Sequence, residues 1–300
     1  MTAGRGAPVS VVIAAHNGQH VIERAVRSVL AQTYRNPELL VVDDGSTDMT
    51  VSILNKYRDR MNVIEQENLG ALAARNLGAR EAGGRYIAFL DQDDYWVPEK
   101  LDMQVKVLDK NPRIGLVFGK LEAVDEQGRS KGFMTNPREY CRSPSLDDMI
   151  LIFPLYPSSA LLRKDLFDRI GGFDTRFGLS GAYGDQDFHI RLRELVPFKF
   201  ADATVGYYTW DEYRPGRIET FVTNLGIFAE KYFNHPYLLN SKNRPLRERF
   251  VQKCFDHWAY LMRTLLRRNK NVVTLEQLLL ANMCQKQFRS IFGDSCFRMA

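Results

Sequence analysis

A repeated succession of apolar strand, polar turn and amphipathic helix constrains the fold of this chain more than any other feature of its sequence. Residues 8–15, PVSVVIAA, are a nearly continuous apolar run rich in valine, which is typical of a strand buried on both faces of a parallel sheet. After His16, Asn17 and Gly18, residues 22–30 place apolar side chains at helical spacing. The beginning of the chain therefore predicts a strand, a turn and a helix.

The same unit recurs up to residue 90. Strands are predicted at residues 39–42, 62–66 and 85–90, and a helical segment follows each of the first two. Strands that alternate with helices in this way form mostly parallel sheets with right-handed crossovers. The expected fold class is therefore α/β, with a mostly parallel sheet flanked by helices.

Candidate end signals frame these helices. The second helix is expected to be capped by Ser46 or Thr47 and to continue through Lys56. The third helix is rich in alanine and is followed by Gly83 and Gly84, which are expected to end it.

The pattern becomes mixed after residue 94. A helix is expected to begin near Pro98, with Leu101, Val105 and Leu108 on its apolar face. The remaining expectations are a strand within 114–124, a turn at 125–128, a strand and a short helix within 158–174, a helix at 185–195 and a helical final third from about Thr220.

Composition is that of an ordinary globular protein, but the charge is unevenly placed. Of the 300 residues, 45% are apolar, which is enough for a sizeable core. Residues 214–300 hold 15 Lys and Arg against 6 Asp and Glu, whereas residues 1–213 hold 26 against 30. We therefore expect one domain of residues 1–213 and a basic helical extension of residues 214–300.

Targeting signals and cysteine usage predict a cytoplasmic protein. The longest apolar run, residues 149–156, is far shorter than the roughly 20 residues that span a bilayer. The N-terminus lacks the apolar core of a signal peptide. The four cysteines form no C-x-x-C pair, which argues against a zinc site and a disulfide framework and favours small core residues in a reducing compartment: Cys141, Cys254, Cys284 and Cys296.

Polar clusters stand at three of the predicted strand ends. His16 and Asn17 follow the first strand, Asp43 and Asp44 the second, and the DQDD segment of residues 91–94 the fourth. Ligands of parallel α/β sheets bind beyond the carboxyl ends of the strands. The three clusters are therefore expected to converge on one cleft.

The DQDD segment contains a D-x-D arrangement of Asp91 and Asp93. Two carboxylates at this spacing can share Mg²⁺ or Mn²⁺ and leave positions open for phosphate oxygens, although a lone D-x-D more often caps a helix or fills a polar turn. Arg75 can reach a diphosphate held by the metal, and Asp44 can accept a hydrogen bond from a nucleobase or ribose. Taken singly, a surface ion pair and an Asx turn explain these two residues equally well, but together the residues indicate a nucleotide diphosphate site.

Five segments, in this order, carry a resemblance to a known family: residues 9–34, 39–48, 68–101, 171–174 and 184–194. They resemble the inverting GT-A glycosyltransferases of glycosyltransferase family 2, from about Pro8 to Tyr208. The resemblance implies a GT-A (Rossmann-like) domain with a nucleotide-sugar-binding half at about residues 8–120 and an acceptor half at about 121–213.

The resemblance also implies a nucleotide-sugar donor, most often a UDP-sugar, bound with Mn²⁺ or Mg²⁺. Asp44 would read the base, Arg75 would face the phosphates, and Asp94 would hydrogen-bond beside the metal. Asp91 and Asp93 would be the metal ligands, with Asp93 the more direct of the two. The full set of implied donor-binding residues is Ala14, Ala15, Asn17, Asp43, Asp44, Arg75, Asp91 and Gln92.

The catalytic base of the family is an aspartate in a later acidic motif, commonly Glu-Asp, just before a helix. Asp185 stands at this position, Gly184 replaces the glutamate, and Asp187 is the alternative base. Without the motif, a helix N-cap is the more common role for an aspartate that opens an apolar-periodic segment, as Asp185 does. An inverting transfer needs a carboxylate that takes the proton of the acceptor hydroxyl as it attacks the anomeric carbon opposite the leaving diphosphate.

Other functions are weighed against this one. A nucleotidyltransferase would need a triphosphate loop rich in glycine and basic residues after the first strand, and AAHNGQH supplies none. A nucleotide-sugar-binding or scaffold protein without transfer activity is the non-enzyme alternative. The sequence has no Q-x-x-R-W motif, which disfavours a processive polysaccharide synthase, and the expected acceptor is a glycan or a lipid-linked molecule.

Histidines and aromatic residues near the expected site have weaker assignments. His16 and His189 are expected to be turn and helix-face residues rather than metal ligands, because neither has a second histidine at ligand spacing. Residues 210–214, WDEYR, occupy a region where members of the family often carry an Arg and a His over the donor, and here the histidine is missing.

The basic extension leaves two interpretations open and disfavours a third. Its apolar helix face can pack on the catalytic domain or on another subunit of a homo-oligomer, or the helix can lie on an anionic membrane where lipid-linked acceptors are found. Nucleic-acid binding is disfavoured because no recognised module accompanies the charge. The face comprises Val251, Cys254, Phe255, Trp258, Met262 and Leu265.

Overall fold

The computed structural model describes residues 8–125, 127–134, 143–152, 155–178, 183–210 and 217–268, together with positions 286 and 291. The chain forms two compact units. The first comprises Met1–Thr175 and Asp185–Glu212, and the second comprises Arg176–Gly184 and Tyr213–Ala300. In the described part of the chain, no helix is both long enough and apolar enough to cross a membrane.

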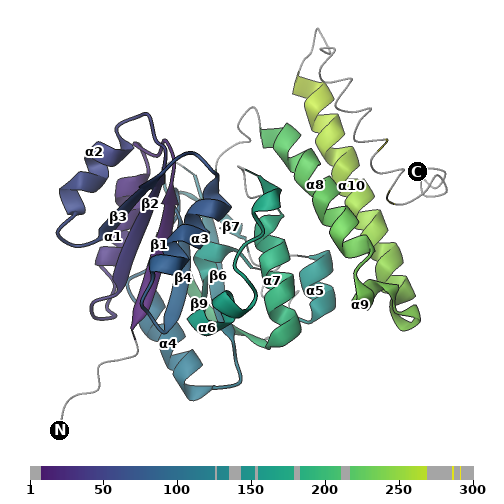
Figure 1. Ribbon diagram of the computed structural model, residues 1–300, viewed down its shortest axis with the longest axis horizontal. Helices are drawn as coiled ribbons and strands as arrows, with labels where there is room; N and C mark the ends of the chain where they lie inside the picture. The colour runs from purple at the N-terminus through teal and green to yellow at the C-terminus, as the bar shows by residue number, and fades with distance from the viewer. Residues whose placement is uncertain are drawn as a thin grey trace. The chain divides into compact units, whose positions relative to one another are not determined.

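Four parallel strands form the first part of the sheet, in the order β3-β2-β1-β4 (Figure 1). They are β1 (Val9–Ala15), β2 (Glu38–Asp44), β3 (Asn62–Gln66) and β4 (Tyr86–Asp91). The apolar runs of β1, β2 and β4 are almost completely buried, as expected of strands covered on both faces, whereas β3 at the edge of the sheet is partly exposed. Ala15 pairs with Asp43 and Ala14 with Asp91, so the polar residues that follow these strands begin at one level of the sheet.

Helices α1 (Ile22–Leu30), α2 (Thr50–Leu54) and α3 (Ala71–Glu81) connect these strands. The expected cap of α2 is wrong: neither Ser46 nor Thr47 caps it, and the carboxylate of Asp48 accepts the Thr50 N–H at 2.9 Å. The helix is also shorter than expected, because Asn55–Tyr57 continue it as a 3-10 turn.

Gly83 and Gly84 do not cap α3, whose C-cap is the extended residue Ala82. A Cβ at Gly84 would stand 2.6 Å from the backbone nitrogen of Ser10. The glycine therefore permits the close approach of the chain to β1 rather than a left-handed helix end.

The second part of the sheet is mixed, and its strands follow β4 in the order β8-β6-β9-β5. Strand β8 runs antiparallel to β4 and β6, while β6 and β9 are parallel. The strands are β5 (Tyr95–Trp96), β6 (Leu116–Val124), β7 (Ser130–Phe133), β8 (Ala160–Arg163) and β9 (Phe198–Thr209). The sequence predicts β6 and β8 correctly but gives no expectation of β9, which brings Thr209 to the neighbourhood of β5.

Helices α4 (Lys100–Lys110), α5 (Leu146–Leu151), α6 (Lys164–Arg169) and α7 (Gly184–Leu195) accompany the second part of the sheet. The expected helices at Pro98 and at residues 185–195 are confirmed, and Leu101, Val105 and Leu108 are buried as expected. Short 3-10 turns lie at Pro157–Ser159 and Thr175–Phe177.

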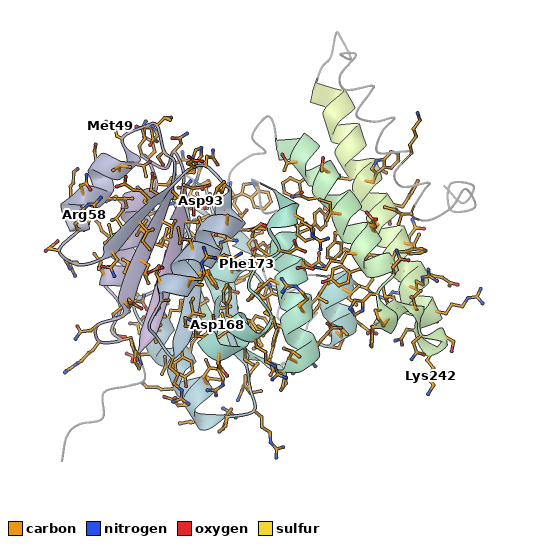
Figure 2. The ribbon with its side chains drawn as sticks, in the orientation of Figure 1. Met49, Arg58, Asp93, Asp168, Phe173 and Lys242 are labelled. Carbon is orange, nitrogen blue, oxygen red and sulfur yellow. The ribbon has the colours of Figure 1, made fainter. Side chains whose placement is uncertain are left out.

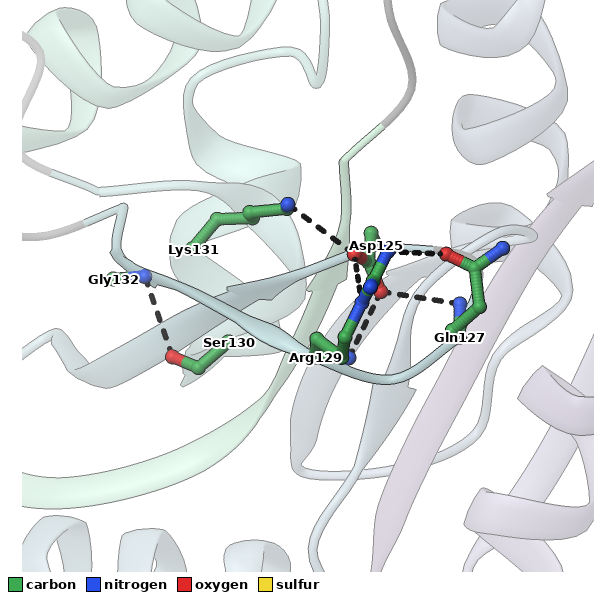
Figure 3. A network of polar contacts seen from close by, with 6 residues as sticks. All are labelled: Asp125, Gln127, Arg129, Ser130, Lys131 and Gly132. Carbon is green, nitrogen blue, oxygen red and sulfur yellow. Dashed lines mark hydrogen bonds and ion pairs between the residues drawn. The ribbon is translucent and has the colours of Figure 1, made fainter.

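The turn between β6 and β7 is organised around one carboxylate (Figure 3). Asp125 accepts the backbone N–H groups of Gln127 and Arg129 and pairs with the side chains of Arg129 and Lys131. These donors and cations lower the pKa of Asp125 to about 2. All the partners lie within six residues, so the turn predicted at residues 125–128 is held locally.

The second unit contains α8 (Arg217–Phe233), α9 (Pro236–Leu239), the 3-10 turn Ser241–Asn243 and α10 (Arg244–Arg268). The described residues of this unit from Arg217 to Arg268 are mostly helical, as expected, and Cys254 is buried like Phe228, Tyr232 and Phe250, which confirms its core role. Cys141, Cys284 and Cys296, and the side chains of Met262 and Leu265, lie outside the described residues.

Candidate functional site

The ends of β1, β2 and β4 meet through the residues that follow them. The backbone N–H of His16 donates to Gln92 Oε1 at 2.9 Å, and Gln92 Nε2 donates back to the His16 carbonyl at 3.0 Å. His16 Nδ1 lies 2.8 Å from the Asp44 carbonyl. The three polar clusters thus converge as predicted, and both polar groups of Gln92 hold the turn after β1.

Asn17 occupies a left-handed conformation with φ of 47° and ties its turn to the one after β2. Its backbone N–H donates to Ser46 Oγ at 2.9 Å, and its Oδ1 accepts the Thr47 N–H at 2.8 Å. Ala14, which is partly exposed, and Ala15, which is buried, end the strand that precedes this turn.

Asp43 and Asp44 are both buried but differ in their partners. Asp44 accepts Gln66 Nε2 at 2.6 Å and the backbone N–H groups of Leu69 and Gly70, both at 2.8 Å. Its carboxylate therefore fixes the loop that leads into α3. Asp43 accepts the Ser46 N–H at 3.1 Å through Oδ2, while its buried Oδ1 has no hydrogen-bond partner.

The DQDD segment begins at the last residue of β4 and turns back on itself, with the Asp94 N–H donating to the Asp91 carbonyl at 3.1 Å. Figure 2 labels Asp93 at the end of the sheet where the parallel strands finish. Asp94 is buried, and its Oδ1 accepts the Thr209 N–H at 3.1 Å. Burial, together with the charges of Asp91 and Asp93, raises the pKa of Asp94 well above its ordinary value.

Arg75 joins the D-x-D segment to the predicted base. It projects from α3, is only 5% exposed, and pairs through Nη2 with Asp91 Oδ1 and through Nη1 with Asp185 Oδ1 at 2.7 Å. The two carboxylates belong to segments far apart in the chain, so their shared cation defines one site. Both carboxylates hold the pKa of Arg75 above its ordinary value despite burial.

Asp185 lies in the first turn of α7 and keeps 22% of its side chain exposed. Burial raises its pKa to about 6, the charge of Arg75 opposes this rise, and the charge of Asp91 adds to it. A carboxylate with this pKa is mostly ionised at neutral pH and still basic enough to accept a proton.

Asp187, the alternative base, is fully buried and pairs with Arg191 at 2.8 Å. Arg191 also donates to the carbonyls of Ile170 and Gly172, so the pair connects α7 to the turn after α6. This arrangement favours Asp185 over Asp187 as the group that meets a substrate.

Asp91 and Asp93 suit Mg²⁺ or Mn²⁺ by the chemistry of their oxygen donors. Burial and the charges of Asp91 and Asp93 raise the pKa of Asp94, so an added cation at this segment would relieve repulsion among these carboxylates. Among the described residues, no group of three His, Cys, Asp or Glu side chains is arranged to hold a metal. The two carboxylates fit a cation that brings further oxygen ligands with it, such as those of a diphosphate.

Two sets of contacts support the DQDD segment and were not predicted: those of Ser158 and those of Lys100. Ser158 Oγ accepts the Asp91 N–H at 3.1 Å, and the Ser158 carbonyl accepts Trp96 Nε1 at 2.7 Å. Lys100 is fully buried: its Nζ lies 3.9 Å from the centre of the Trp96 ring and donates to Gln104 Oε1 at 2.8 Å and to the Ala160 carbonyl at 3.1 Å. Burial lowers the pKa of Lys100 well below its ordinary value.

Of the predicted region at residues 210–214, only Trp210 is described, and it is half-exposed; residues 211–214 lie outside the described residues.

Comparisons with known proteins identify the family. The sequence model of Glycosyl transferase family 2 matches residues 10–171, which include β1 to β4, Arg75 and the DQDD segment. The chain belongs to glycosyl transferase family 2. The resemblance predicted from the five segments is therefore confirmed.

Curated relatives of this family 2 chain match it over part of its length. An uncharacterized glycosyltransferase of Rickettsia prowazekii is 34% identical over 204 residues, which cover 62% of this chain and 63% of that protein. Escherichia coli WfaP, a UDP-Glc:alpha-D-GlcNAc-diphosphoundecaprenol beta-1,3-glucosyltransferase, is 46% identical over 103 residues, or 34% of this chain and 41% of its own length. The chain thus spans roughly half of the length of these relatives.

A solved structure shows the same fold. Staphylococcus aureus TarS in complex with UDP-GlcNAc superposes with a TM-score of 0.70 at 20% identity, covering 95% of this chain and 81% of that one. The predicted α/β, GT-A fold of this family 2 chain is therefore confirmed.

Proposed function

We propose that this family 2 chain is an inverting glycosyltransferase that moves a sugar from a UDP-sugar to a hydroxyl group of a glycan or lipid-linked acceptor. The observation that carries the proposal is the position of Arg75, whose guanidinium contacts both the D-x-D segment and Asp185. One cation thus stands between the carboxylates expected at the diphosphate and the carboxylate expected at the acceptor.

Each group has a role that follows from its chemistry. Asp185 takes the proton of the acceptor hydroxyl while that oxygen attacks the anomeric carbon, and no covalent enzyme intermediate is needed. Arg75 stabilises negative charge that develops on the departing diphosphate. Asp93 and Asp91 would hold Mn²⁺ or Mg²⁺, which supplies further positive charge to the leaving group.

The nucleoside is proposed to bind at the joined ends of β1 and β2. Asp43 Oδ1, buried and without a hydrogen-bond partner, and the fixed turn at Asn17 support this placement. Asp44 already accepts three donors of its own chain, so its first contribution is to shape the loop at Leu69. The name of WfaP, which gives UDP-Glc as its donor and an undecaprenol-linked diphosphate as its acceptor, supports a lipid-linked acceptor and a UDP-sugar donor.

The experiment is a donor screen followed by a test of the base. Purified wild-type protein is incubated with a panel of UDP-sugars in Mn²⁺, and thermal stabilisation and sugar release are measured. With the best donor, Asp185→Asn is expected to lower turnover by about 10²- to 10⁴-fold while the Kd for UDP in Mn²⁺ stays within about twofold. Normal turnover in this variant would refute the base, and UDP binding without any transfer would favour the nucleotide-sugar-binding alternative.

Contact of the second unit with an anionic membrane stays a prediction. On the described exposed face of α10, Arg244 and Arg249 alternate with Glu248 and Asp256, so both signs of charge are present. Liposome flotation with and without anionic lipid tests this contact, and failure to float at moderate salt would exclude it.

A further inference from the structure

The backbone of the D-x-D segment is held from two elements that are remote in the sequence. Arg24 of α1 donates through Nη2 to the carbonyl of Asp93 at 2.8 Å and to Thr209 Oγ1 at 2.7 Å. Thr209, the last residue of β9, donates its own hydroxyl to the same Asp93 carbonyl. Arg24, Thr209 and the Asp93 carbonyl therefore form a closed triangle of hydrogen bonds.

The same two residues also contact the two residues that follow Asp93. The Thr209 N–H donates to Asp94 Oδ1 at 3.1 Å, and the guanidinium carbon of Arg24 lies 4.5 Å from the centre of the Tyr95 ring. Tyr95 stacks on Tyr207 of β9, with ring centres 4.7 Å apart. The segment that follows Asp93 is thus tied to α1 and β9 through the side chains of Asp94 and Tyr95.

Among the described residues, the charge of Arg24 is directed at the segment and not at a carboxylate. The two hydrogen-bond acceptors that the described part of the chain offers it, the Asp93 carbonyl and the Thr209 hydroxyl, are uncharged. A guanidinium held against a main-chain carbonyl between Asp91 and Asp94 offsets part of the repulsion among the three carboxylates. It does so without using a carboxylate oxygen that a ligand needs.

We propose that Arg24 is a positioning residue that acts through Asp93, with Thr209 as its partner. The pair fixes the main chain of Asp93 so that its carboxylate is presented to the diphosphate and its cation before they bind. This inference rests on the proposed function for its ligand, but the hydrogen-bond triangle exists in the free protein. A role limited to holding α1 against β5 would predict lost stability with no selective loss of cation-dependent binding.

The first experiment measures hydrogen exchange in the ligand-free protein. Arg24→Met keeps an apolar stem but removes both hydrogen bonds, and it is expected to speed exchange of the Asp94 and Thr209 amides by about tenfold or more. Thr209→Val, which keeps the β-branched shape, should speed the same amides. Arg27→Met on the same helix is the matched control, because Arg27 is exposed and contacts only Glu23 and Tyr57. Exchange that is equal in the Arg24 and Arg27 variants would overturn the proposal.

The second experiment measures binding of UDP by calorimetry in Mn²⁺ and in EDTA. Arg24→Met is expected to raise the Kd in Mn²⁺ by about tenfold and to change the Kd in EDTA much less, with Arg24→Lys intermediate because it keeps the charge but loses the fork. Thr209→Val should add little to Arg24→Met, since both act on one carbonyl. An equal rise in both buffers would leave only the structural role and sink the proposal. Absence of UDP binding by the wild type would instead refute the proposed function, while the exchange experiment would still decide the triangle.

Discussion

The turns after β2 and β4 are both acidic strand ends, yet they use their carboxylates in opposite ways. The carboxylate of Asp44 accepts hydrogen bonds from Gln66, Leu69 and Gly70, which are all donors of its own chain. The segment after β4 instead keeps an excess of negative charge, with Arg75 shared between Asp91 and Asp185 and with a raised pKa at Asp94. The carboxylate of Asp44 is therefore satisfied by its own chain, whereas the segment after β4 is suited to a positively charged ligand.

The largest effect on stability is expected at Arg75, where the second turn meets the base. Arg75→Met leaves Asp91 and Asp185 without their shared cation and is expected to lower the free energy of unfolding by about 3 kcal/mol. Urea denaturation measures this change. Arg85→Met is the control, because Arg85 is exposed and its ion pair with Asp109 is long, at 3.9 Å. This substitution should lower the free energy of unfolding by no more than about 0.5 kcal/mol. Equal stability of the two variants would show that the site tolerates its charges without Arg75.

A smaller effect separates the two turns directly. Asp44→Asn faces its amide nitrogen toward donors and is expected to lower the free energy of unfolding by about 2 kcal/mol. Asp93→Asn is expected to leave stability nearly unchanged or to raise it, because it removes a repelling charge, and to weaken UDP binding in Mn²⁺ much more than in EDTA. Urea denaturation and calorimetry of both variants provide the test. The opposite ranking, with Asp93→Asn the less stable variant, would end the distinction between the turns.

The smallest effect is a pH dependence at the base. The pKa of Asp185 in the folded protein is about 6, above its ordinary value, so the folded state binds this proton more tightly than the unfolded chain. Stability from this group is therefore present at low pH and is lost as pH rises from about 4 to about 6. Transfer needs the ionised form, so kcat/KM should fall about tenfold per unit below pH 6.

The arginine provides a check on this assignment. Because the charge of Arg75 lowers the pKa of Asp185, the midpoint in residual activity of Arg75→Met should move to higher pH. A midpoint that stays in place, or moves down, would mean that another group controls the profile.

The parallel half of the fold could be predicted because its signals are local. The apolar runs of β1, β2 and β4 are almost completely buried, and the polar residues that follow them had to meet at one edge. The strand β9 was missed because Asp202, Gly206 and four partly exposed tyrosine and threonine positions interrupt its pattern. Its pairing with β6 and β5 depends on tertiary contacts, which the composition of the strand itself does not predict.

The candidate site was predictable in its charged residues but not in their supports. Asp91, Asp93, Arg75 and Asp185 stand in motifs, and the structure brings Arg75, Asp91 and Asp185 together. Arg24 and Thr209 are separated by 185 positions. The sequence around an arginine on an amphipathic helix does not indicate that the arginine has so distant a partner. The loop donors of Asp44 were missed for the same reason, since the chain returns to it only after β3 and its turn.

The buried amine of Lys100 can be used to detect local unfolding beneath the D-x-D segment. Its amine has a strongly lowered pKa and is fully enclosed against Trp96 and Ala160, so it is a good nucleophile that no reagent can reach in the closed fold. Acylation of this lysine would therefore require local unfolding of the residues that pack around it below the D-x-D segment. The acylation rate, followed by mass spectrometry with and without UDP, would report how often this local unfolding occurs while the remainder of the protein stays folded.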